Sequence, residues 1–312
     1  MSFNELDRAQ ILAEALPYIQ KFSGKTIVVR YDSGAVHGEM IETVISDIIL
    51  LSLVGIRVVV VHGGTPEINN MLALLGRESK FSDGLRCTDA QTMPVVQQVL
   101  CGQVNKDLVA ALNRLGGKAV GLCGLDGGLF QAKKLDEKYG LVGNIVKVDA
   151  AMVSSVLASG YVPVVAPVAQ GTDGPTSYNV DADTAAARLA VAMEAEKLVL
   201  LTDVRGLFRT PGDETTLIPE LQLSSVPALV REGVIAGEMV HKVDCCPLRC
   251  GLRRHPGWPG VPLPAYRAAH RRRRGHHAHQ LRRAYEKRPA EAAGPVQGGY
   301  RHHPEYGGPA EI

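Results

Sequence analysis

The stretch IRVVVVHGGTPEINNML, at positions 56–72, decides the fold of this chain. After Ile56 and Arg57 it has four consecutive valines, a continuous apolar run that is typical of a β-strand buried on both faces. Gly63 and Gly64 follow, and Pro66 then occupies a favoured first position of an α-helix. The stretch therefore predicts a buried strand, a tight glycine turn and a helix.

The same order recurs along the first 246 residues. The run KTIVVRY predicts another buried strand, and a long helix follows it to about Leu53. Later apolar runs lie at 118–124, 161–169 and 197–204, and helical stretches lie at 91–114, 147–159, 183–194 and 225–233. Strands that alternate with helices predict an α/β fold, a three-layer α/β/α sandwich with a mainly parallel central sheet.

The N-terminal segment, residues 1–24, is expected to form an amphipathic helix over 3–22. Leu12, Leu16 and Ile19 share one stripe, and Pro17 predicts a kink. The first ten residues include acids and have no apolar core of the kind that a signal peptide requires.

Composition places the chain among globular proteins. Apolar residues make up 46% and charged residues 21% of 312 residues, which excludes a disordered chain. No run of 18 apolar residues offers a membrane span. Six cysteines without CxxC spacing suit reduced thiols, so we expect a cytoplasmic protein.

The glycine turn is a candidate anion site. Backbone amides of Gly63 and Gly64 at a helix N-terminus favour a phosphate or carboxylate, although such a turn can also be purely structural. The sequence has neither a Walker A loop nor a GxGxxG dinucleotide fingerprint.

Four further residues are candidates for substrate binding or catalysis, and each also has a simpler structural explanation. Arg86, in GLRCTD, suits a substrate carboxylate but can equally be a solvated loop arginine. Asn179 and Asp183 bracket a helix start, where Asp183 can serve as an N-cap. Lys242 follows a glycine-bearing loop, and a single lysine is usually a surface charge.

The order of these segments resembles the acetylglutamate kinases of the amino-acid kinase family. The matching segments cover nearly four-fifths of the chain and include VHGGTPEINNML, FSDGLRCTDAQTM, VLCGQVNKDLV, YNVDADTAA, KLVLLTDVRGLF and GEMVHKVDCC. The resemblance implies an amino-acid kinase domain over 25–246, with an acetylglutamate lobe at about 25–175 and a nucleotide lobe from about 176, near LLTDVRGLF.

The resemblance also implies an activity, ATP-dependent phosphorylation of the side-chain carboxylate of N-acetyl-L-glutamate in arginine biosynthesis, with Mg²⁺ brought by ATP. Gly63 and Gly64 would cradle phosphoryl oxygens, while Arg86 and Asn179 would hold acetylglutamate. Catalytic roles fall to the other three: Arg30 and Lys242 would neutralise charge, and Asp183 would orient these cations. The initial helix resembles the extension that links dimers into hexamers in arginine-sensitive members, so a homo-oligomer and inhibition by arginine are expected.

The sequence departs from the family at the first strand. Where the family has Lys-Tyr-Gly-Gly, residues 30–33 read Arg-Tyr-Asp-Ser. Asp32 is expected to repel a phosphate, by roughly 1 to 4 kcal/mol at about 4 Å. Thr65 stands for a third glycine and Asp181 for an asparagine. These changes raise an alternative function, a catalytically inactive regulatory or scaffold homologue.

Composition changes abruptly after residue 246. Residues 247–312 carry 13 Lys and Arg against 4 acids, with 9 of the 18 prolines and 7 of the 10 histidines, which predicts a disordered basic tail. Four consecutive arginines at 271–274 offer a nucleic-acid-binding alternative, but no aromatic platform accompanies them. The histidines show no repeated metal-ligand spacing.

The genetic code offers a different explanation of this tail. Codons for residues 255–260, translated one nucleotide later, permit Ile-Leu-Asp-Gly-Arg-Val, a segment typical of the family's C-terminus. Residues 264–269 and 275–277 permit two further family segments in the family order. We therefore hypothesise that the chain from about residue 247 is an out-of-frame translation, which would leave the C-terminal lobe incomplete.

Overall fold

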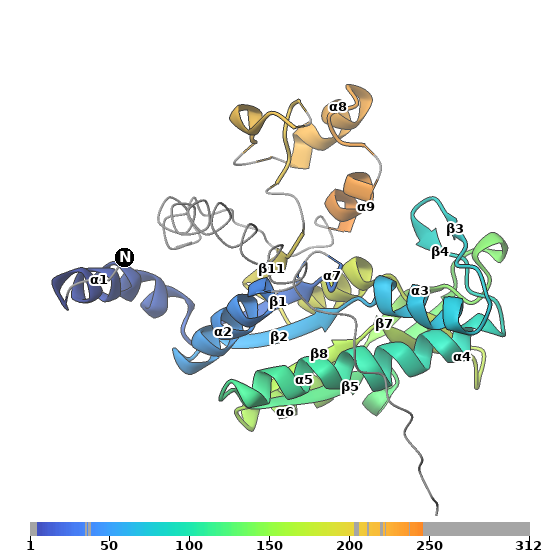
Figure 1. The fold of residues 1–312 in the computed structure, drawn as a ribbon, viewed down its shortest axis with the longest axis horizontal. Coiled ribbons are helices and arrows are strands. Elements are labelled where there is room, and N and C mark those ends of the chain that lie inside the picture. Colours follow the sequence, from blue (N-terminus) through green and yellow to red (C-terminus); the bar gives the residue numbers. More distant parts are fainter. Residues whose placement is uncertain are drawn as a thin grey trace, which may run out of the picture. The chain divides into compact units, whose positions relative to one another are not determined.

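A computed structural model describes residues 5–34, 36, 39–202, 206–210, 212–218, 221, 223–236 and 238–245 (Figure 1). The basic tail, and with it the predicted frame change and incomplete C-terminal lobe, lies outside the described residues. Residues 203–205, part of the predicted nucleotide region, also lie outside them.

A five-stranded parallel sheet forms the centre of the fold. Its order is β11-β1-β2-β8-β5, with the bounds Lys197–Leu200, Thr26–Tyr31, Arg57–His62, Val162–Ala166 and Ala119–Cys123. Strands β1 and β2 lie inside the sheet and are almost wholly buried, which explains their continuous apolar sequences.

Helices cover both faces of this sheet (Figure 1). Helices α2 (Glu39–Leu53) and α5 (Asn105–Arg114) pack on one face, and α6 (Ala151–Ala158) and α7 (Ala182–Ala192) on the other. Because neighbouring side chains of a strand point to opposite faces, Ile27 joins the core under α2 and α5, whereas Val28 joins the core under α6 and α7. The predicted three-layer sandwich is confirmed.

A second sheet of four strands was not predicted. Its order is β10-β9-β6-β7, and all its pairs are antiparallel except β6 with β9; the bounds are Ser177–Asn179, Val168–Gly171, Phe130–Lys134 and Gly143–Val148. The apolar run 161–169, predicted as one strand, is divided at Pro167 between β8 in the first sheet and β9 in the second. Proline has no N–H to continue a ladder, so it marks the change of sheet.

The predicted helix over 91–114 has three parts. Helix α4 (Thr92–Gln97) continues through a π-helical segment, η1 (Gln98–Val104), into α5. Helix α1 (Glu5–Phe22) continues through Pro17 as one helix, and Phe22 is buried in the core under α2. Helix α3 (Thr65–Leu74) begins close to the predicted start, with Pro66 as its second residue rather than its first.

The remaining described elements are short. A hairpin consists of β3 (Phe81–Ser82) and β4 (Leu85–Arg86). Single turns of 3₁₀ helix lie at η2 (Asp126–Gly128), η3 (Glu137–Tyr139), η4 (Glu214–Thr216) and η5 (Leu223–Ser225). Helices α8 (Val226–Arg231) and α9 (Glu238–Cys245) share a small apolar core, and α9 packs against α7. None of the helices in the described ranges is long and apolar enough to cross a membrane.

Candidate active site

The seven residues predicted from the sequence meet at the carboxyl ends of β1 and β2, the edge where parallel sheets commonly bind ligands. Two cavities open there. A small one of about 90 Å³ is lined by Gly63, Gly64, Arg86 and Asn179, and a larger cleft of about 740 Å³ is lined by Asp183 and Lys242. Arg30 lines both. The structure therefore places all seven around one connected site.

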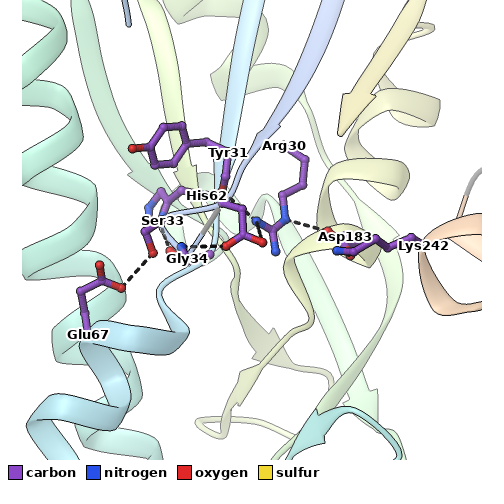
Figure 2. Close-up of polar contacts among 10 residues, drawn as sticks. Arg30, Tyr31, Ser33, Gly34, His62, Glu67, Asp183 and Lys242 are labelled. Carbon is purple, nitrogen blue, oxygen red and sulfur yellow. Dashed lines mark hydrogen bonds and ion pairs between the residues drawn. The ribbon is translucent and has the colours of Figure 1, made fainter. Parts of the chain in front are cut away.

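Asp183 holds the two cations of the larger cleft (Figure 2). Its Oδ1 lies 2.6 Å from Nε of Arg30, and its Oδ2 accepts a hydrogen bond of 2.9 Å from Nζ of Lys242. Asp183 is only 4% exposed, so both ion pairs are sheltered from water. A single carboxylate thus sets the separation of two positive groups.

Asp183 is not the N-cap of α7, which corrects one of the sequence-based alternatives. The cap is Asp181, whose carboxylate accepts a hydrogen bond of 2.8 Å from the backbone N–H of Thr184. Asp183 lies in the first turn of the helix, where its negative charge also suits the helix dipole. Capping by Asp181 leaves both carboxylate oxygens of Asp183 for the cations.

Asp32 does not stand alone at the site. Its Oδ2 lies 3.3 Å from Nη1 of Arg30, and its Oδ1 accepts a hydrogen bond of 3.0 Å from the backbone N–H of Gly34. Because Arg30 is so close, part of the negative charge expected to repel a phosphate is neutralised within the turn. Ser33 in turn donates to Glu67 at 2.9 Å, which joins this turn to α3 (Figure 2).

The glycine turn is shaped by packing rather than by unusual backbone angles. Gly64 has φ 172°, an extended conformation open to any residue, but an added Cβ would lie 2.7 Å from Cδ2 of Leu100. At Gly63 a Cβ would lie 3.3 Å from Nη2 of Arg30. Thr65 is not among the described non-glycine residues with positive φ, so the turn accepts it in place of a third glycine.

Arg86 is buried against the small cavity. Its Nη1 donates to Oγ of Ser79 at 2.9 Å and its Nη2 donates to Oδ1 of Asn69 at 2.7 Å, while the guanidinium lies 4.7 Å from the ring centre of Phe81. These acceptors are neutral, so its charge remains available to an acidic ligand. Burial lowers the pKa of Arg86 to about 10, which still leaves it charged at neutral pH.

Asn179 is linked to Arg86 through Thr88. Its Nδ2 donates to Oγ1 of Thr88 at 3.1 Å, and the Thr88 hydroxyl donates to the backbone carbonyl of Arg86. Thr88 is buried, so this short chain fixes the two predicted substrate-binding residues relative to each other. The link joins strand β10 to the residues that follow β4.

Two buried polar residues behind the glycine turn were missed in the sequence. His62 ends β2 and Asn105 begins α5, and their side chains form a hydrogen bond of 3.2 Å. The sequence placed His62 next to Gly63, but its partner lies 43 positions away. A polar residue at the end of an otherwise apolar strand was the one available signal.

The described residues contain no group of three or more histidine, cysteine, aspartate or glutamate side chains that could hold a metal ion.

Comparison with known proteins identifies the class. The model of the amino acid kinase family matches residues 18–250, so this chain belongs to that family. It is 54% identical over 254 residues to the acetylglutamate kinase of Heliobacterium modesticaldum, a match that covers 77% of this chain and 86% of the relative. The acetylglutamate kinase of Clostridium beijerinckii is 49% identical over 256 residues, with 80% and 90% covered.

A solved structure agrees with these relatives. The N-acetylglutamate synthase of Neisseria gonorrhoeae, complexed with coenzyme A and N-acetyl-glutamate, superimposes with a TM-score of 0.67 at 29% identity. The match covers 78% of this chain and spans 55% of the synthase chain.

Proposed function

We propose that this chain transfers a phosphoryl group from ATP to the side-chain carboxylate of N-acetyl-L-glutamate, forming N-acetyl-L-glutamyl 5-phosphate in arginine biosynthesis. The observation that carries this proposal is the position of Arg30, which lines both the small cavity and the larger cleft. Because Arg30 borders both cavities, its positive charge would contact an acceptor in one and a nucleotide in the other. The acetylglutamate kinases among its relatives match over most of their length.

The small cavity is proposed to hold the acceptor. Arg86 and Asn179 would bind acetylglutamate, and the Arg86 guanidinium would form an ion pair with a carboxylate of this substrate. The acceptor carboxylate would then face Gly64, whose backbone N–H suits an oxygen of the transferring group. The N–H of Gly63, predicted to share this role, instead donates to the carbonyl oxygen of Tyr31 at 3.1 Å. The neighbours of Gly64 in the cavity wall, Leu100 and Pro167, are apolar and limit water there.

The cations supply the catalytic effect. Phosphoryl transfer needs little covalent help, so the protein contributes position and positive charge. Arg30 and Lys242 would face the charge that spreads over the transferring group, and Asp183 would orient them. Because Asp183 contacts both, a single carboxylate positions the two cations.

The larger cleft is proposed to take ATP with its Mg²⁺. We assign acetylglutamate to a lobe at about 25–175 and the nucleotide to a lobe from about 176. Asp183 and Lys242, which line the cleft, come from this second part of the chain. The Mg²⁺ is treated as part of the nucleotide substrate, and its ligands would be phosphate oxygens and water.

The ion pair between Arg30 and Asp32 bears on the alternative, a catalytically inactive homologue. The substitutions at 30 and 32 are two of the changes that raised that alternative. In the structure the Arg30 guanidinium offsets part of the Asp32 charge and still reaches Asp183. The geometry therefore favours a working kinase.

We also propose a cytoplasmic homo-oligomer that arginine inhibits. Leu16 on α1 is 51% exposed, an apolar side chain that suits a helix–helix contact between subunits. Light scattering of the wild type and of Leu16→Glu tests this contact. A wild type that is monomeric, or a variant with an unchanged mass, would contradict it.

The activity is tested by ADP release from the full chain with N-acetyl-L-glutamate, N-acetyl-L-aspartate, L-aspartate or carbamate as acceptor. Trapping the acyl phosphate with hydroxylamine identifies the product. We expect release that depends on N-acetyl-L-glutamate and is lost in Lys242→Met. A folded wild type that releases no ADP with this acceptor would overturn the proposal.

A further inference from the structure

The glycine turn has a buried support. His62 is 0% exposed, and its ring lies between the turn and the start of α5. Its Nδ1 lies 2.8 Å from the carbonyl oxygen of Gly63, and its Nε2 lies 3.2 Å from Nδ2 of Asn105. Both ring nitrogens therefore have a partner inside the protein.

The orientation of the Asn105 amide is determined by its other neighbours. Its two Nδ2 hydrogens are shared among three acceptors, which are the carbonyl oxygens of Val164 at 2.9 Å and Leu122 at 3.2 Å and Nε2 of His62. Its Oδ1 accepts from Nζ of Lys106 at 3.0 Å. Carbonyl oxygens only accept and an ammonium only donates. The amide nitrogen, rather than its oxygen, must therefore face His62.

These partners select one form of the imidazole ring. The Gly63 carbonyl can only accept, so Nδ1 carries a hydrogen, and the Asn105 amide nitrogen can only donate, so Nε2 must be unprotonated. Burial lowers the pKa of His62 to about 4, and the charges of Arg30 and Lys106 act in the same direction. The ring is thus a neutral imidazole at the pH of biosynthesis.

The Gly63 carbonyl and the Gly64 N–H belong to the same peptide group. In a planar trans peptide these two bonds point in opposite directions, and the described residues contain no cis peptide. Because His62 holds the carbonyl on the buried side, the Gly64 N–H is directed away from His62. Gly64 borders the small cavity, where the transferring group is expected.

We propose that His62, held by Asn105 as the tautomer protonated on Nδ1, is a positioning residue that fixes the Gly63–Gly64 peptide so that the Gly64 N–H serves the transferring phosphoryl group. This inference rests on the proposed function and deepens it. His62 itself touches neither substrate. Its effect reaches the reaction through one backbone donor.

Two substitutions separate the halves of this arrangement. In His62→Asn the side-chain amide nitrogen takes a position close to Nδ1 and can still hold the Gly63 carbonyl. In His62→Gln the longer side chain reaches Asn105 but leaves that carbonyl without its donor. Both replacements are polar, so each changes the chemistry of this buried position less than an apolar substitution would.

The kinetic test compares kcat and KM of the two variants with ATP and N-acetyl-L-glutamate. Loss of a donor to the transition state costs roughly 100-fold in kcat, so we expect that loss in His62→Gln with KM for N-acetyl-L-glutamate nearly unchanged. His62→Asn, which keeps a donor to the Gly63 carbonyl, is expected to lose much less of its kcat than His62→Gln. Equal losses in both variants, or full kcat in His62→Gln, would overturn the proposal.

A second measurement does not depend on activity. Nitrogen-15 NMR of the wild type labelled at histidine distinguishes a protonated Nδ1 from a protonated Nε2. The proposal requires protonation on Nδ1 alone, and a signal for protonated Nε2 at His62 would overturn it even if a variant failed to fold. If the wild type shows the expected tautomer but transfers no phosphoryl group, the proposed function fails, and with it the catalytic part of this inference.

Discussion

Nζ of Lys242 lies 2.9 Å from Oδ2 of Asp183, although 59 positions separate the two residues. The other oxygen of the same carboxylate lies 2.6 Å from Arg30 on β1. One buried aspartate therefore links the first strand, α7 and α9. In a phosphoryl-transfer site this arrangement keeps two cations close together, which their mutual repulsion would otherwise oppose.

Replacing Asp183 with asparagine keeps the shape of the side chain and removes its charge. Arg30 and Lys242 would then lack their shared counter-ion and shift relative to the substrates. We expect kcat to fall about 100-fold, because misplacement of about 1 Å can have that effect. Steady-state kinetics normalised to folded protein measure it. Asp107→Asn, an exposed carboxylate on α5, is the matched control, and equal behaviour of the two variants would exclude the orienting role.

Arg30 and Asp32 are expected to act as a pair. Arg30→Lys leaves Asp32 without its guanidinium partner, and Asp32→Gly removes the carboxylate that Nη1 of Arg30 contacts. The double variant restores the residues typical of the family at these positions. We expect it to lose less kcat/KM than the two single effects predict, by a coupling of about 1 kcal/mol. Additive losses would show that the two residues act independently.

Arg86→Lys tests the acceptor site. A lysine keeps the charge but cannot contact Ser79 and Asn69 together or stack on Phe81 as a planar group does. We expect KM for N-acetyl-L-glutamate to rise about tenfold or more, with a smaller change in kcat. Arg77→Lys is the control, because Arg77 likewise donates to a side-chain amide, that of Gln91, and pairs with Asp89, but it lines neither cavity of the site. An unchanged KM in Arg86→Lys would remove Arg86 from the acceptor site.

His62 makes the fold sensitive to acid. Its pKa is about 4 in the folded chain against 6.5 in the unfolded one, so the unfolded state gains a proton first as pH falls. The free energy of unfolding should therefore lose about 3 kcal/mol from this residue between pH 6.5 and 4, and nothing from it above pH 6.5. Urea titrations of the wild type and His62→Asn at several pH values isolate this loss. Parallel pH profiles would contradict it.

The tail beyond residue 246 leads to a prediction about the gene. If the tail is an out-of-frame translation, DNA across codons 240–280 will contain one nucleotide too many or too few relative to the family frame. Sequencing that region, and weighing the expressed protein by mass spectrometry, decides the matter. A confirmed 312-residue product with an unbroken frame would refute the hypothesis.

Local sequence was enough for much of the fold. The four valines form a buried strand, and Gly63 and Gly64 form the turn after it. Both conformations depend on residues only a few positions away in the sequence. Strands β6, β7 and β10 of the second sheet were missed for the opposite reason. Strand β6, FQAKK, is short and half polar, and its stability comes from β7 and β9 rather than from its own composition.

The site divides in the same way. Sequence alone predicted an α/β chain with a glycine turn, and the resemblance to the acetylglutamate kinases pointed to the seven site residues, because motif order and spacing are properties of the chain itself. Only the tertiary structure decided that Asp181 caps α7 while Asp183 binds Arg30 and Lys242, that Arg30 neutralises Asp32, and that Asn105 selects the tautomer of His62. Each of these three contacts depends on distances of about 3 Å between polar atoms. Folding creates such distances between groups that are far apart in the chain, and it decides which of several nearby groups binds a given partner.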